Sequence, residues 1–483
     1  KQGESDTNME DGGLWQLSVL EDKFPVPDDC AGAVMYQIFP DRFYQAGACD
    51  LAGKIEPYWV HENKDDVPVY LPDANGEVLN NDFYGGNLNG IREKLPYLHE
   101  LGVEFLYLNP IFYAWSTHRY DTCDYKRIDP MLGTEEDFRA LCNAAHALGM
   151  KVILDGVFSH VGSRSAYFQQ AIHDPASPYR GWFRFKQYPN VYDSWWGITT
   201  LPCVDKMNPD YMDYIIDSDD SVVVRWLMLG ADGWRLDVAN ELDDGFLRAF
   251  RTAVKAAKPD AIIVGEVWEN AAHYLNGDMM DSAMNYDFRR YCRRFFAEET
   301  VDAETFDTNV STLLLRYREN ALFAQLNLLD SHDVSRYLSL CGENVDKMEL
   351  SVLLQMTFPG MPCVFYGDEK GLCGLSESEY RQAMAWGNAH PLEDVYRRLI
   401  ALRKEHPALR YGDFVTNFAA GKTYSYSRNW ENTRITVTMN LGGAPIPAPQ
   451  TGRLLLKKGG NHDIIGAWEY EVREERIHGG DDL

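Results

Sequence analysis

Short β-forming runs alternate with amphipathic helical stretches from Met35 to about Arg403, and this rhythm limits the fold more than any other feature of the chain. Each run is four to six residues long, is rich in apolar and aromatic residues, and precedes a segment with helical spacing of its apolar positions. Alternation of this kind builds βα units, which form parallel sheets covered by helices. Eight candidate strands can be counted, at residues 34–39, 105–108, 151–155, 233–237, 262–266, 283–286, 325–329 and 363–366.

Eight βα units fit a closed barrel better than an open doubly wound sheet, which usually stops at about five to seven strands. We therefore predict an α/β fold, a (β/α)8 TIM barrel over residues 33–409. After the third strand, residues 161–210 form a long irregular stretch that holds three tryptophans. Loops of this length inside a compact domain are usually functional, so we expect an inserted loop subdomain there.

The two ends of the chain depart from the βα rhythm. Residues 410–483 contain alternating segments separated by Gly and Pro clusters, which predicts a C-terminal antiparallel β domain, a small β-sandwich. Residues 1–32 are acidic and irregular, and we interpret them as an N-terminal extension. Within it, residues 14–19 have the pattern of a strand, which we interpret as the remnant of a preceding β domain.

The charge balance excludes two classes of partner. A formal net charge of −27 is unsuited to nucleic acid or to an anionic membrane, because phosphate binding needs clustered cations. No run of about 18 apolar residues occurs, so we expect no transmembrane span. The chain starts without Met and without the basic and apolar regions of a signal peptide, so we expect it to be trimmed.

The cysteines predict the redox environment. There are nine of them, an odd number, and they are dispersed along the chain without any CxxC pair. This pattern favours reduced thiols over a disulfide framework or a zinc site, and we expect a cytoplasmic protein with no metal site of this kind.

Ionisable residues stand where apolar strands end. They follow the third, fourth, fifth and seventh strands, as Asp155 and His160, Arg235 and Asp237, Glu266, and His332 and Asp333. In a barrel the carboxyl ends of the strands converge on one face, where barrel enzymes build their sites. A single Asp at a strand end is equally well explained as a helix cap or a buried ion-pair member. Four strand-end acids, occurring together with an Arg and two His, predict a catalytic site.

Two of these carboxyl groups have neighbours that would give them opposed acid strengths, as cleavage of a glycosidic bond requires. Arg235 shares a strand face with Asp237, and its cation would lower the pKa of Asp237 and keep it ionised as a nucleophile. Glu266 ends an apolar run two residues before Trp268, so we expect desolvation to raise its pKa and suit it to general acid catalysis. A third acid, Asp333, is expected to bind sugar hydroxyls and stabilise positive charge in the transition state.

Four segments resemble the four motifs of the α-amylase family in content, in order and in strand position. They are DGVFSH at 155–160, GWRLDVANE at 233–241, GEVW at 265–268 and LLDSHD at 328–333. Further matches, YQIFPDRF at 36–43 and YGDE at 366–369, extend the resemblance over residues 36–405.

The resemblance implies a role for each strand-end residue. It implies that Asp237 is the nucleophile, Glu266 the acid/base and Asp333 the stabiliser of the transition state. It also implies that Tyr120, in the segment HRYDT, stacks on the sugar at the cleavage point. The expected substrate-binding set comprises Tyr120, Asp155, His160, Arg235, Trp268 and His332.

Within the family, the segments VANE at 238–241 and LPCVD at 201–205 look most like the neopullulanase and cyclomaltodextrinase group. That group typically carries Met or Leu followed by PKLN at the second of these places, so Cys203 and Asp205 are departures. A preceding β domain is usual in the group and often mediates dimerisation. The resemblance therefore implies a homodimer formed through an N-terminal domain that this chain lacks.

The resemblance also bears on calcium. Many α-amylases bind a structural calcium ion through an Asn just before the first-motif His and a His four residues after the nucleophile. Those positions hold Ser159 and Glu241 here. A Ser hydroxyl is a poor calcium ligand, although a Glu carboxylate is a good one. We expect this family site to be lost and no cofactor to be required, with a structural calcium elsewhere left open.

The sequence thus predicts a retaining hydrolase of α-1,4-glucosidic bonds in starch-derived maltooligosaccharides, with α-1,6 bonds, pullulan or cyclodextrins as further substrates. Cleavage would proceed by double displacement through a covalent intermediate on Asp237. Two alternatives stay open, an α-glucosidase or a transglycosylase that acts on short α-glucans with the same three acids. A non-catalytic carbohydrate-binding relative is a more distant alternative, against which the presence of all three acids argues.

Overall fold

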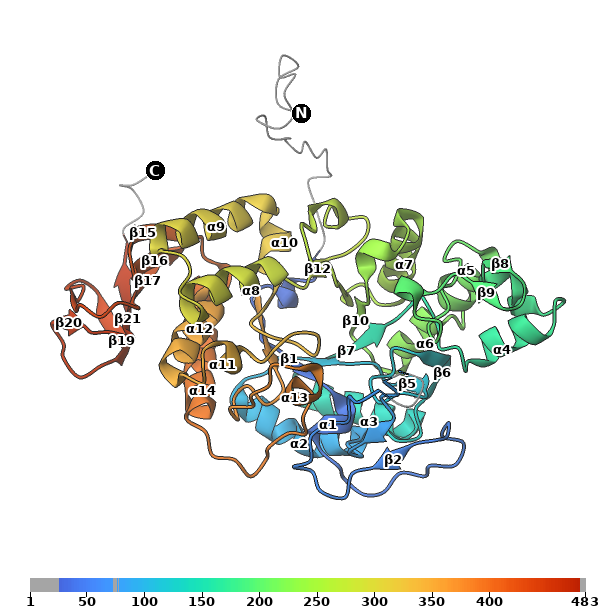
Figure 1. Ribbon diagram of the computed structural model, residues 1–483. Coiled ribbons are helices and arrows are strands. Elements are labelled where there is room, and N and C mark those ends of the chain that lie inside the picture. Colours follow the sequence, from blue (N-terminus) through green and yellow to red (C-terminus); the bar gives the residue numbers. More distant parts are fainter. Residues whose placement is uncertain (1–25, 73–75, 77, 478–483) are drawn as a thin grey trace, which may run out of the picture.

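The computed structural model describes residues 26–72, 76 and 78–477 (Figure 1). Its centre is an eight-stranded sheet in which every strand pair is parallel, in the order β12-β11-β10-β7-β4-β1-β14-β13. A parallel bridge between Met284 and Leu326 joins the two end strands and closes the sheet into a barrel. The strands are β1 (Met35–Ile38), β4 (Phe105–Leu108), β7 (Lys151–Gly156), β10 (Gly233–Leu236), β11 (Ile262–Gly265), β12 (Ser282–Ala283), β13 (Leu326–Leu328) and β14 (Met361–Phe365).

The predicted barrel is confirmed, and each of its eight strands coincides with a predicted run. The sixth predicted strand, at residues 283–286, extends too far at its carboxyl end. The strand β12 stops at Ala283, and Asn285 instead caps the helix α8 (Tyr286–Cys292) by accepting a hydrogen bond from Phe288 N at 3.1 Å. An Asn side chain competes with strand pairing by binding nearby backbone N–H groups, which is why it ends the run early.

Alternate residues of the barrel strands belong to two separate cores. In β4, Phe105 and Tyr107 pack inside the barrel, while Leu106 and Leu108 pack outward against the helices. This division follows from the period of two of a strand, and it fills the barrel with side chains instead of leaving a pore. The outer core is covered by the helices α2 (Leu88–Leu101), α3 (Glu135–Ala147), α6 (Val222–Leu229), α7 (Asp244–Ala257), α9 (Ala303–Arg316), α12 (Val345–Thr357) and α14 (Pro391–Glu405).

Local signals in the sequence set the limits of these helices. Thr134 and Asp137 form a reciprocal capping box at the start of α3. The helix α2 ends at Gly102, whose φ of 99° is the left-handed conformation that glycine adopts most readily. A side chain at Gly102 would also collide with Ile400 of α14, because a Cβ there would lie 2.6 Å from the Ile400 side chain.

The predicted inserted stretch contains short elements of its own. Between β7 and α6 lie the helix α4 (Ala166–His173), the antiparallel pair β8 (Phe185–Gln187) and β9 (Val191–Tyr192), and the helix α5 (Pro209–Met212). Figure 1 shows these elements grouped at one end of the molecule, beside α6 and α7. Further connecting elements are α1 (Pro40–Phe43), β2 (Trp59–Val60), β3 (Asp82–Phe83), β5 (Phe112–Ala114), β6 (Thr122–Ile128), α10 (Glu319–Phe323), α11 (Tyr337–Leu340), α13 (Glu377–Tyr380) and α15 (Pro407–Tyr411).

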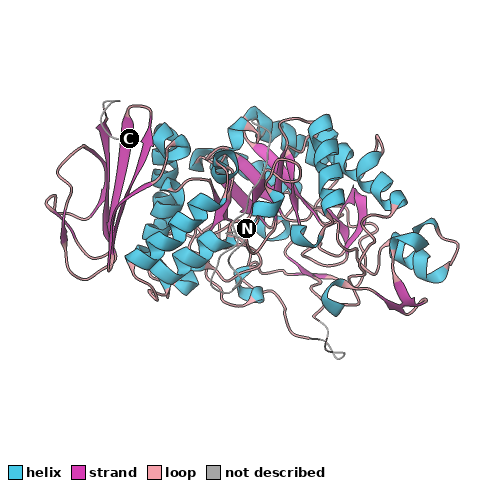
Figure 2. Cartoon of the chain, turned by 90° about the horizontal axis from the view of Figure 1, so that it is seen from above, coloured by secondary structure: helices cyan, strands magenta, loops and turns pink. Residues whose placement is uncertain are grey.

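A C-terminal antiparallel β domain lies beside the barrel, as predicted (Figure 2). It has one five-stranded sheet, in the order β15-β16-β17-β21-β19, and one two-stranded sheet, β18-β20. The strands are β15 (Val415–Ala420), β16 (Thr423–Trp430), β17 (Thr433–Asn440), β18 (Ile446–Pro447), β19 (Arg453–Lys458), β20 (Ile464–Ile465) and β21 (Glu469–Arg476).

Three further predictions concern the N-terminal strand, the cysteines and membrane-spanning helices. The strand expected at 14–19 lies outside the described residues. All nine cysteines lie in the described part and are free thiols there. In the same part of the chain, no helix is both long enough and apolar enough to cross a membrane.

The junction between barrel and C-terminal domain is built around a fully buried arginine that has no carboxylate partner among the described residues. Arg428 of β16 donates hydrogen bonds to the backbone carbonyls of Thr357, Leu409, Gly412 and Asp413 at 2.5–2.9 Å. Thr357 is the last residue of α12, and the other three carbonyls belong to the connection between α14 and β15. One side chain therefore satisfies backbone groups from both domains.

Arg428→Met should destabilise the protein strongly, because it keeps the apolar stem but leaves several buried carbonyls without a donor. We expect a loss of about 3 kcal/mol or more in the free energy of unfolding, measured by chemical denaturation. Arg453→Met is the matched control, because the Arg453 side chain is 70% exposed and pairs with Glu474 on the surface. A similar loss in both variants would contradict a special role for Arg428.

Candidate active site

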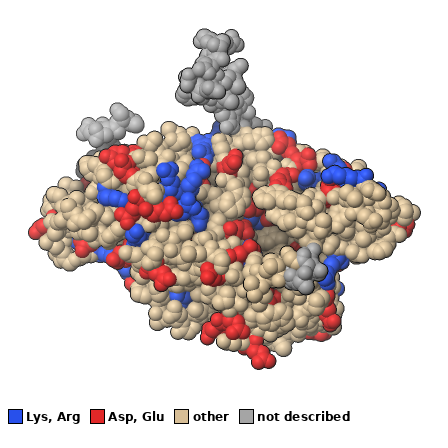
Figure 3. All heavy atoms as spheres, viewed as in Figure 1, with Lys and Arg blue, Asp and Glu red and all other residues tan. Residues whose placement is uncertain are grey.

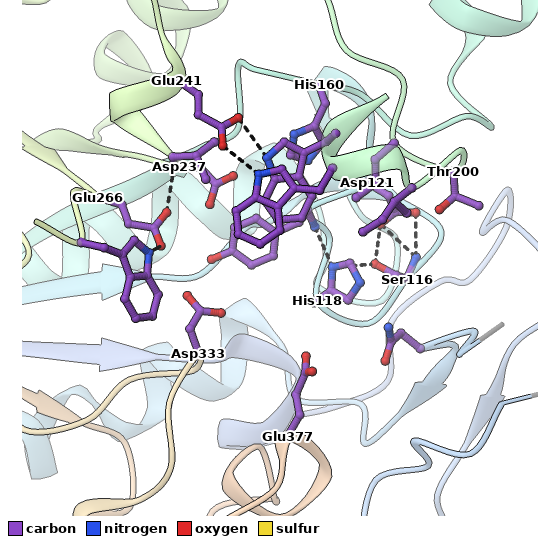
Figure 4. A pocket seen from close by; sticks show the side chains of 18 of the residues that line it. Ser116, His118, Asp121, His160, Thr200, Asp237, Glu241, Glu266, Asp333 and Glu377 are labelled. Carbon is purple, nitrogen blue, oxygen red and sulfur yellow. Dashed lines mark hydrogen bonds between the residues drawn. The ribbon is translucent and has the colours of Figure 1, made fainter. Parts of the chain in front are cut away.

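A cleft of about 1240 Å³ opens at the carboxyl ends of the barrel strands. Figure 3 shows the surface hollowed near its centre, with acidic side chains at the edge of the hollow. The cleft is lined by residues from the barrel, from the inserted subdomain and from the loop after β14. Among the predicted site residues, those that line it are Tyr120, His160, Asp237, Glu266, Trp268 and Asp333. In the close view of Figure 4, Asp237, Glu266 and Asp333 point toward one shared space.

A buried guanidinium lies beneath this space and joins three carboxyl groups. Arg235 Nη1 lies 2.8 Å from Asp155 Oδ1 and 2.9 Å from Asp237 Oδ1, and Nη2 lies 2.9 Å from Glu266 Oε2. The arrangement follows from strand order, because β10 lies between β7 and β11 and Arg235 is directly opposite Asp155 in the ladder. Arg235 is 1% exposed, so all three ion pairs are shielded from water.

The acid strength of Asp237 differs from the prediction. Burial raises the pKa of Asp237 well above its ordinary value, and neighbouring carboxyls of Glu266, Asp155 and Asp333 raise it further. Arg235 lowers the pKa, as predicted, but its effect is smaller than that of burial. The expectation of a net lowered pKa is therefore wrong for the unliganded site.

Glu266 is held by two hydrogen bonds and one ion pair. Its Oε2 accepts a hydrogen bond from Val238 N at 2.8 Å and pairs with Arg235, and its Oε1 accepts one from Trp268 Nε1 at 2.9 Å. Val238 reaches this position with a φ of 38°, in the left-handed region that a β-branched residue adopts only under strain. Trp268 is 45% exposed, so it acts on Glu266 as a hydrogen-bond donor and not as the apolar cover that the sequence suggested.

Asp333 lies between a histidine and an arginine. Its Oδ2 is 3.0 Å from His332 Nε2, and its Oδ1 is 3.2 Å from Arg381 Nη2. Gln37 donates its amide to His332 Nδ1 at 2.8 Å, which places the ring hydrogen of His332 on Nε2, facing Asp333 and Tyr120. Burial lowers the pKa of His332 well below its usual value, so this histidine is neutral at pH 7.

Tyr120 and His160 complete the predicted set. The Tyr120 hydroxyl donates to Asp155 Oδ2 at 2.9 Å, and its ring is parallel to that of His332 with centroids 5.4 Å apart. His160 Nδ1 contacts Ser159 Oγ at 2.8 Å. His160 Nε2 is buried and has no hydrogen-bond partner among the described residues, although His160 lines the cleft. A buried polar atom without a partner next to a cleft is suited to bind a polar ligand.

Two further residues were missed by sequence reasoning. Arg381 follows α13 and binds Asp333, Glu377 and the Tyr70 hydroxyl. Tyr286 stacks on Trp268, with ring centroids 3.9 Å apart and planes 7° apart. These residues come from loops and from a helix start without any motif, so no local pattern could have identified them.

The two positions compared with the family calcium site have other partners. Ser159 Oγ contacts His160, and both oxygens of Glu241 accept hydrogen bonds from indole N–H groups of Trp195 and Trp196, each at 3.1 Å. Within the described ranges, no group of three or more His, Cys, Asp or Glu side chains is arranged to hold a metal ion. The residues present therefore do not fit a calcium ion at this place.

Comparison with known proteins agrees with this geometry. Residues 37–387 match the family model described as "Alpha amylase, catalytic domain". The chain belongs to the α-amylase family. A cyclomaltodextrinase from Thermoanaerobacter pseudethanolicus is 36% identical over 87% of this chain and 72% of its own length. Neopullulanase 2 from Thermoactinomyces vulgaris is 37% identical over 97% of this chain and 78% of its own.

Solved structures show the same similarity. The cyclic alpha-maltosyl-(1→6)-maltose hydrolase from Arthrobacter globiformis, in its ligand-free form, has 31% sequence identity and a TM-score of 0.82, covering 94% of this chain and all of that one. Together these matches show an α-glucan hydrolase of the cyclomaltodextrinase and neopullulanase type. The prediction of an enzyme from this group is confirmed.

His160 should make the fold sensitive to acid. Burial lowers the pKa of His160 to about 4, below the roughly 6.5 of an unfolded histidine. A lowered folded-state pKa means that the stabilising contribution is present above about pH 6.5 and is lost as the pH falls toward 4. Between pH 7 and pH 5 the wild type should therefore lose about 2 kcal/mol more unfolding free energy than His160→Gln.

Denaturant unfolding at the two pH values measures this difference. His99→Gln serves as the control, because His99 is exposed on α2 and should leave the pH dependence as in the wild type. Parallel pH dependences of His160→Gln and the wild type would refute the assignment.

Proposed function

We propose that this enzyme is a retaining hydrolase of α-1,4-glucosidic bonds that also accepts α-1,6 bonds, pullulan or cyclodextrins. The observation that carries the proposal is the single guanidinium of Arg235 beneath Asp237 and Glu266. Two carboxyls bound to the two nitrogens of one guanidinium lie close together. This favours the separation of about 5–5.5 Å used by retaining pairs over the about 6.5–9.5 Å of inverting pairs.

In this proposal Asp237 is the nucleophile. Arg235 holds its Oδ1, while Oδ2 has no hydrogen-bond partner within the described part of the chain. The free oxygen would form a bond to the anomeric carbon as the glycosidic bond breaks. Arg235 would stabilise the carboxylate at the start of the step and after the intermediate is released.

Glu266 supplies and recovers the proton. Its Oε2 accepts a hydrogen bond from Val238 N and pairs with Arg235, so Oε1, which accepts from the indole of Trp268, is the oxygen that would carry the proton. That proton passes to the leaving sugar oxygen in the first step. In the second step the carboxylate takes a proton from the water that attacks the anomeric carbon, and Asp237 is released.

The remaining predicted residues bind the sugar at the cleavage point. Asp333 would stabilise the developing positive charge, and His332, His160 and Tyr120 would bind ring hydroxyls or stack on the ring. The unpartnered Nε2 of His160 and the cleft-facing position of Tyr120 support these roles. Homodimerisation and a cytoplasmic location stay predictions from the sequence.

Glu266→Gln should lower kcat on maltooligosaccharides by roughly 10²–10⁴-fold, because the amide cannot donate the proton. Glu136→Gln, at an exposed position on α3, should leave activity unchanged. The first product should be the α-anomer by proton NMR. A β-anomer would rule out retention, and near-normal activity of Glu266→Gln would rule out the acid assignment.

The substrate range is tested by the product profile of the wild type on starch, pullulan and β-cyclodextrin. Hydrolysis products shorter than the substrate are expected from all three. Products longer than a maltooligosaccharide substrate would instead favour a transglycosylase, because a sugar hydroxyl and water compete for the same intermediate.

We also propose that activity requires no calcium ion at the position of the family site. Ser159 and Glu241 are committed to His160 and to two indoles, so neither has a free oxygen directed at a common ion. Activity and melting temperature should be unchanged after treatment with EDTA and dialysis. A loss that added calcium restores would contradict the proposal.

A further inference from the structure

Three rings lie next to one another from the floor of the cleft to its rim, and the outer two are stacked. The rings of His160 and Trp195 have centroids 5.4 Å apart, and those of Trp195 and Trp196 are 5.0 Å apart with planes at 15°. His160 is buried, Trp195 is partly exposed, and Trp196 is 80% exposed. The stack therefore ends in an indole whose outer face is open to solvent beside the catalytic acids.

One carboxylate fixes the orientation of both indoles. Glu241 Oε2 accepts from Trp195 Nε1 and Oε1 from Trp196 Nε1, both at 3.1 Å, and Figure 4 shows the two hydrogen bonds side by side. Glu241 ends the short turn Ala239–Glu241 that follows β10, only four residues after Asp237. The bond pair thus connects the barrel strand that carries Asp237 to the rim of the inserted subdomain.

The backbone at the outer indole is also unusual. Trp196 has φ 48° and ψ 26°, in the left-handed region that is unfavourable for a residue with a side chain. Strain of this kind persists only where surrounding contacts impose it, and it is concentrated at sites that bind ligands. A tryptophan with a purely structural role would bury its large ring, whereas this one exposes it.

We propose that Trp196 is a stacking platform for a glucose ring of the α-glucan chain beyond the cleavage point, and that Glu241 is the positioning residue that holds the platform. Because Glu241 occupies the indole N–H groups, the face of Trp196 is the part left for a ligand. Apolar C–H faces of pyranose rings pack on such a surface, and their hydroxyls remain in water. This inference rests on the proposed function and adds a determinant of chain length to it.

The first test compares a long and a short substrate. Trp196→Ala should raise KM for maltoheptaose at least tenfold with kcat changed less than twofold. For p-nitrophenyl α-maltoside, which is too short to reach the rim, both parameters should stay within twofold of the wild type. Trp430→Ala is the matched control, because Trp430 is a partly exposed tryptophan of β16 in the C-terminal domain.

The second test asks whether Glu241 acts through Trp196. Glu241→Ala should raise KM for maltoheptaose as Trp196→Ala does, and the double variant should be no worse than either single variant. Glu241→Gln keeps one acceptor oxygen for one indole and should give a smaller increase. It also guards against a folding defect in the Ala variant, which melting temperatures would reveal.

The outcomes separate this inference from the proposed function. If the wild type cleaves neither p-nitrophenyl α-maltoside nor maltoheptaose, the proposed function fails. If the wild type is active but Trp196→Ala matches Trp430→Ala on maltoheptaose, the platform is refuted. If Glu241→Ala impairs both substrates equally, or if its effect adds to that of Trp196→Ala, Glu241 does not act by positioning the indole.

Discussion

The buried charge of Arg235 is the interaction on which the site depends. One cation lies within 2.9 Å of three carboxyl oxygens, and the side chain is almost fully shielded from water. In a medium of low dielectric constant, one cation cannot offset three ionised carboxyls at this distance. Burial accordingly raises the pKa of both Asp155 and Asp237, and repulsion by the neighbouring carboxyls raises the pKa of Asp237 further. Both aspartates are therefore harder to ionise in this site than they would be in water.

The barrel creates this arrangement from residues that are distant in the sequence. Parallel pairing places Arg235 opposite Asp155 on one side and opposite Val264 on the other, two residues before Glu266. These three strands and the ionisable residues at their ends could be predicted from the sequence. Each of the three is a short apolar run that ends at an ionisable residue. The prediction depends only on local pattern and on the rule that the carboxyl ends of barrel strands converge. The same reasoning failed at Asn285, where a side-chain cap ended the strand earlier than hydrophobicity indicated.

The electrostatic details could not be predicted, since they depend on groups that the sequence does not bring together. The sequence shows Arg235 two positions from Asp237, but it does not show how deeply the pair is buried or how many other acids surround it. Likewise, Arg381 binds the hydroxyl of Tyr70, which is 311 positions away in the chain. Loops without a repeating pattern carry both residues to the site, and only the folded structure reveals that they meet beside Asp333.

The division between strands and loops also explains how chemistry and substrate choice are related in this molecule. The acids lie on strand ends that the barrel fixes, whereas the surface that meets the rest of a glucan chain is built from the inserted subdomain. Backbone pairing joins the two parts, with His160 opposite Cys203, and the side chain of Glu241 adds a second connection. Glu241 lies four residues after Asp237 and accepts hydrogen bonds from both Trp195 and Trp196. This carboxylate therefore ties the orientation of both indoles to the strand end that carries Asp237.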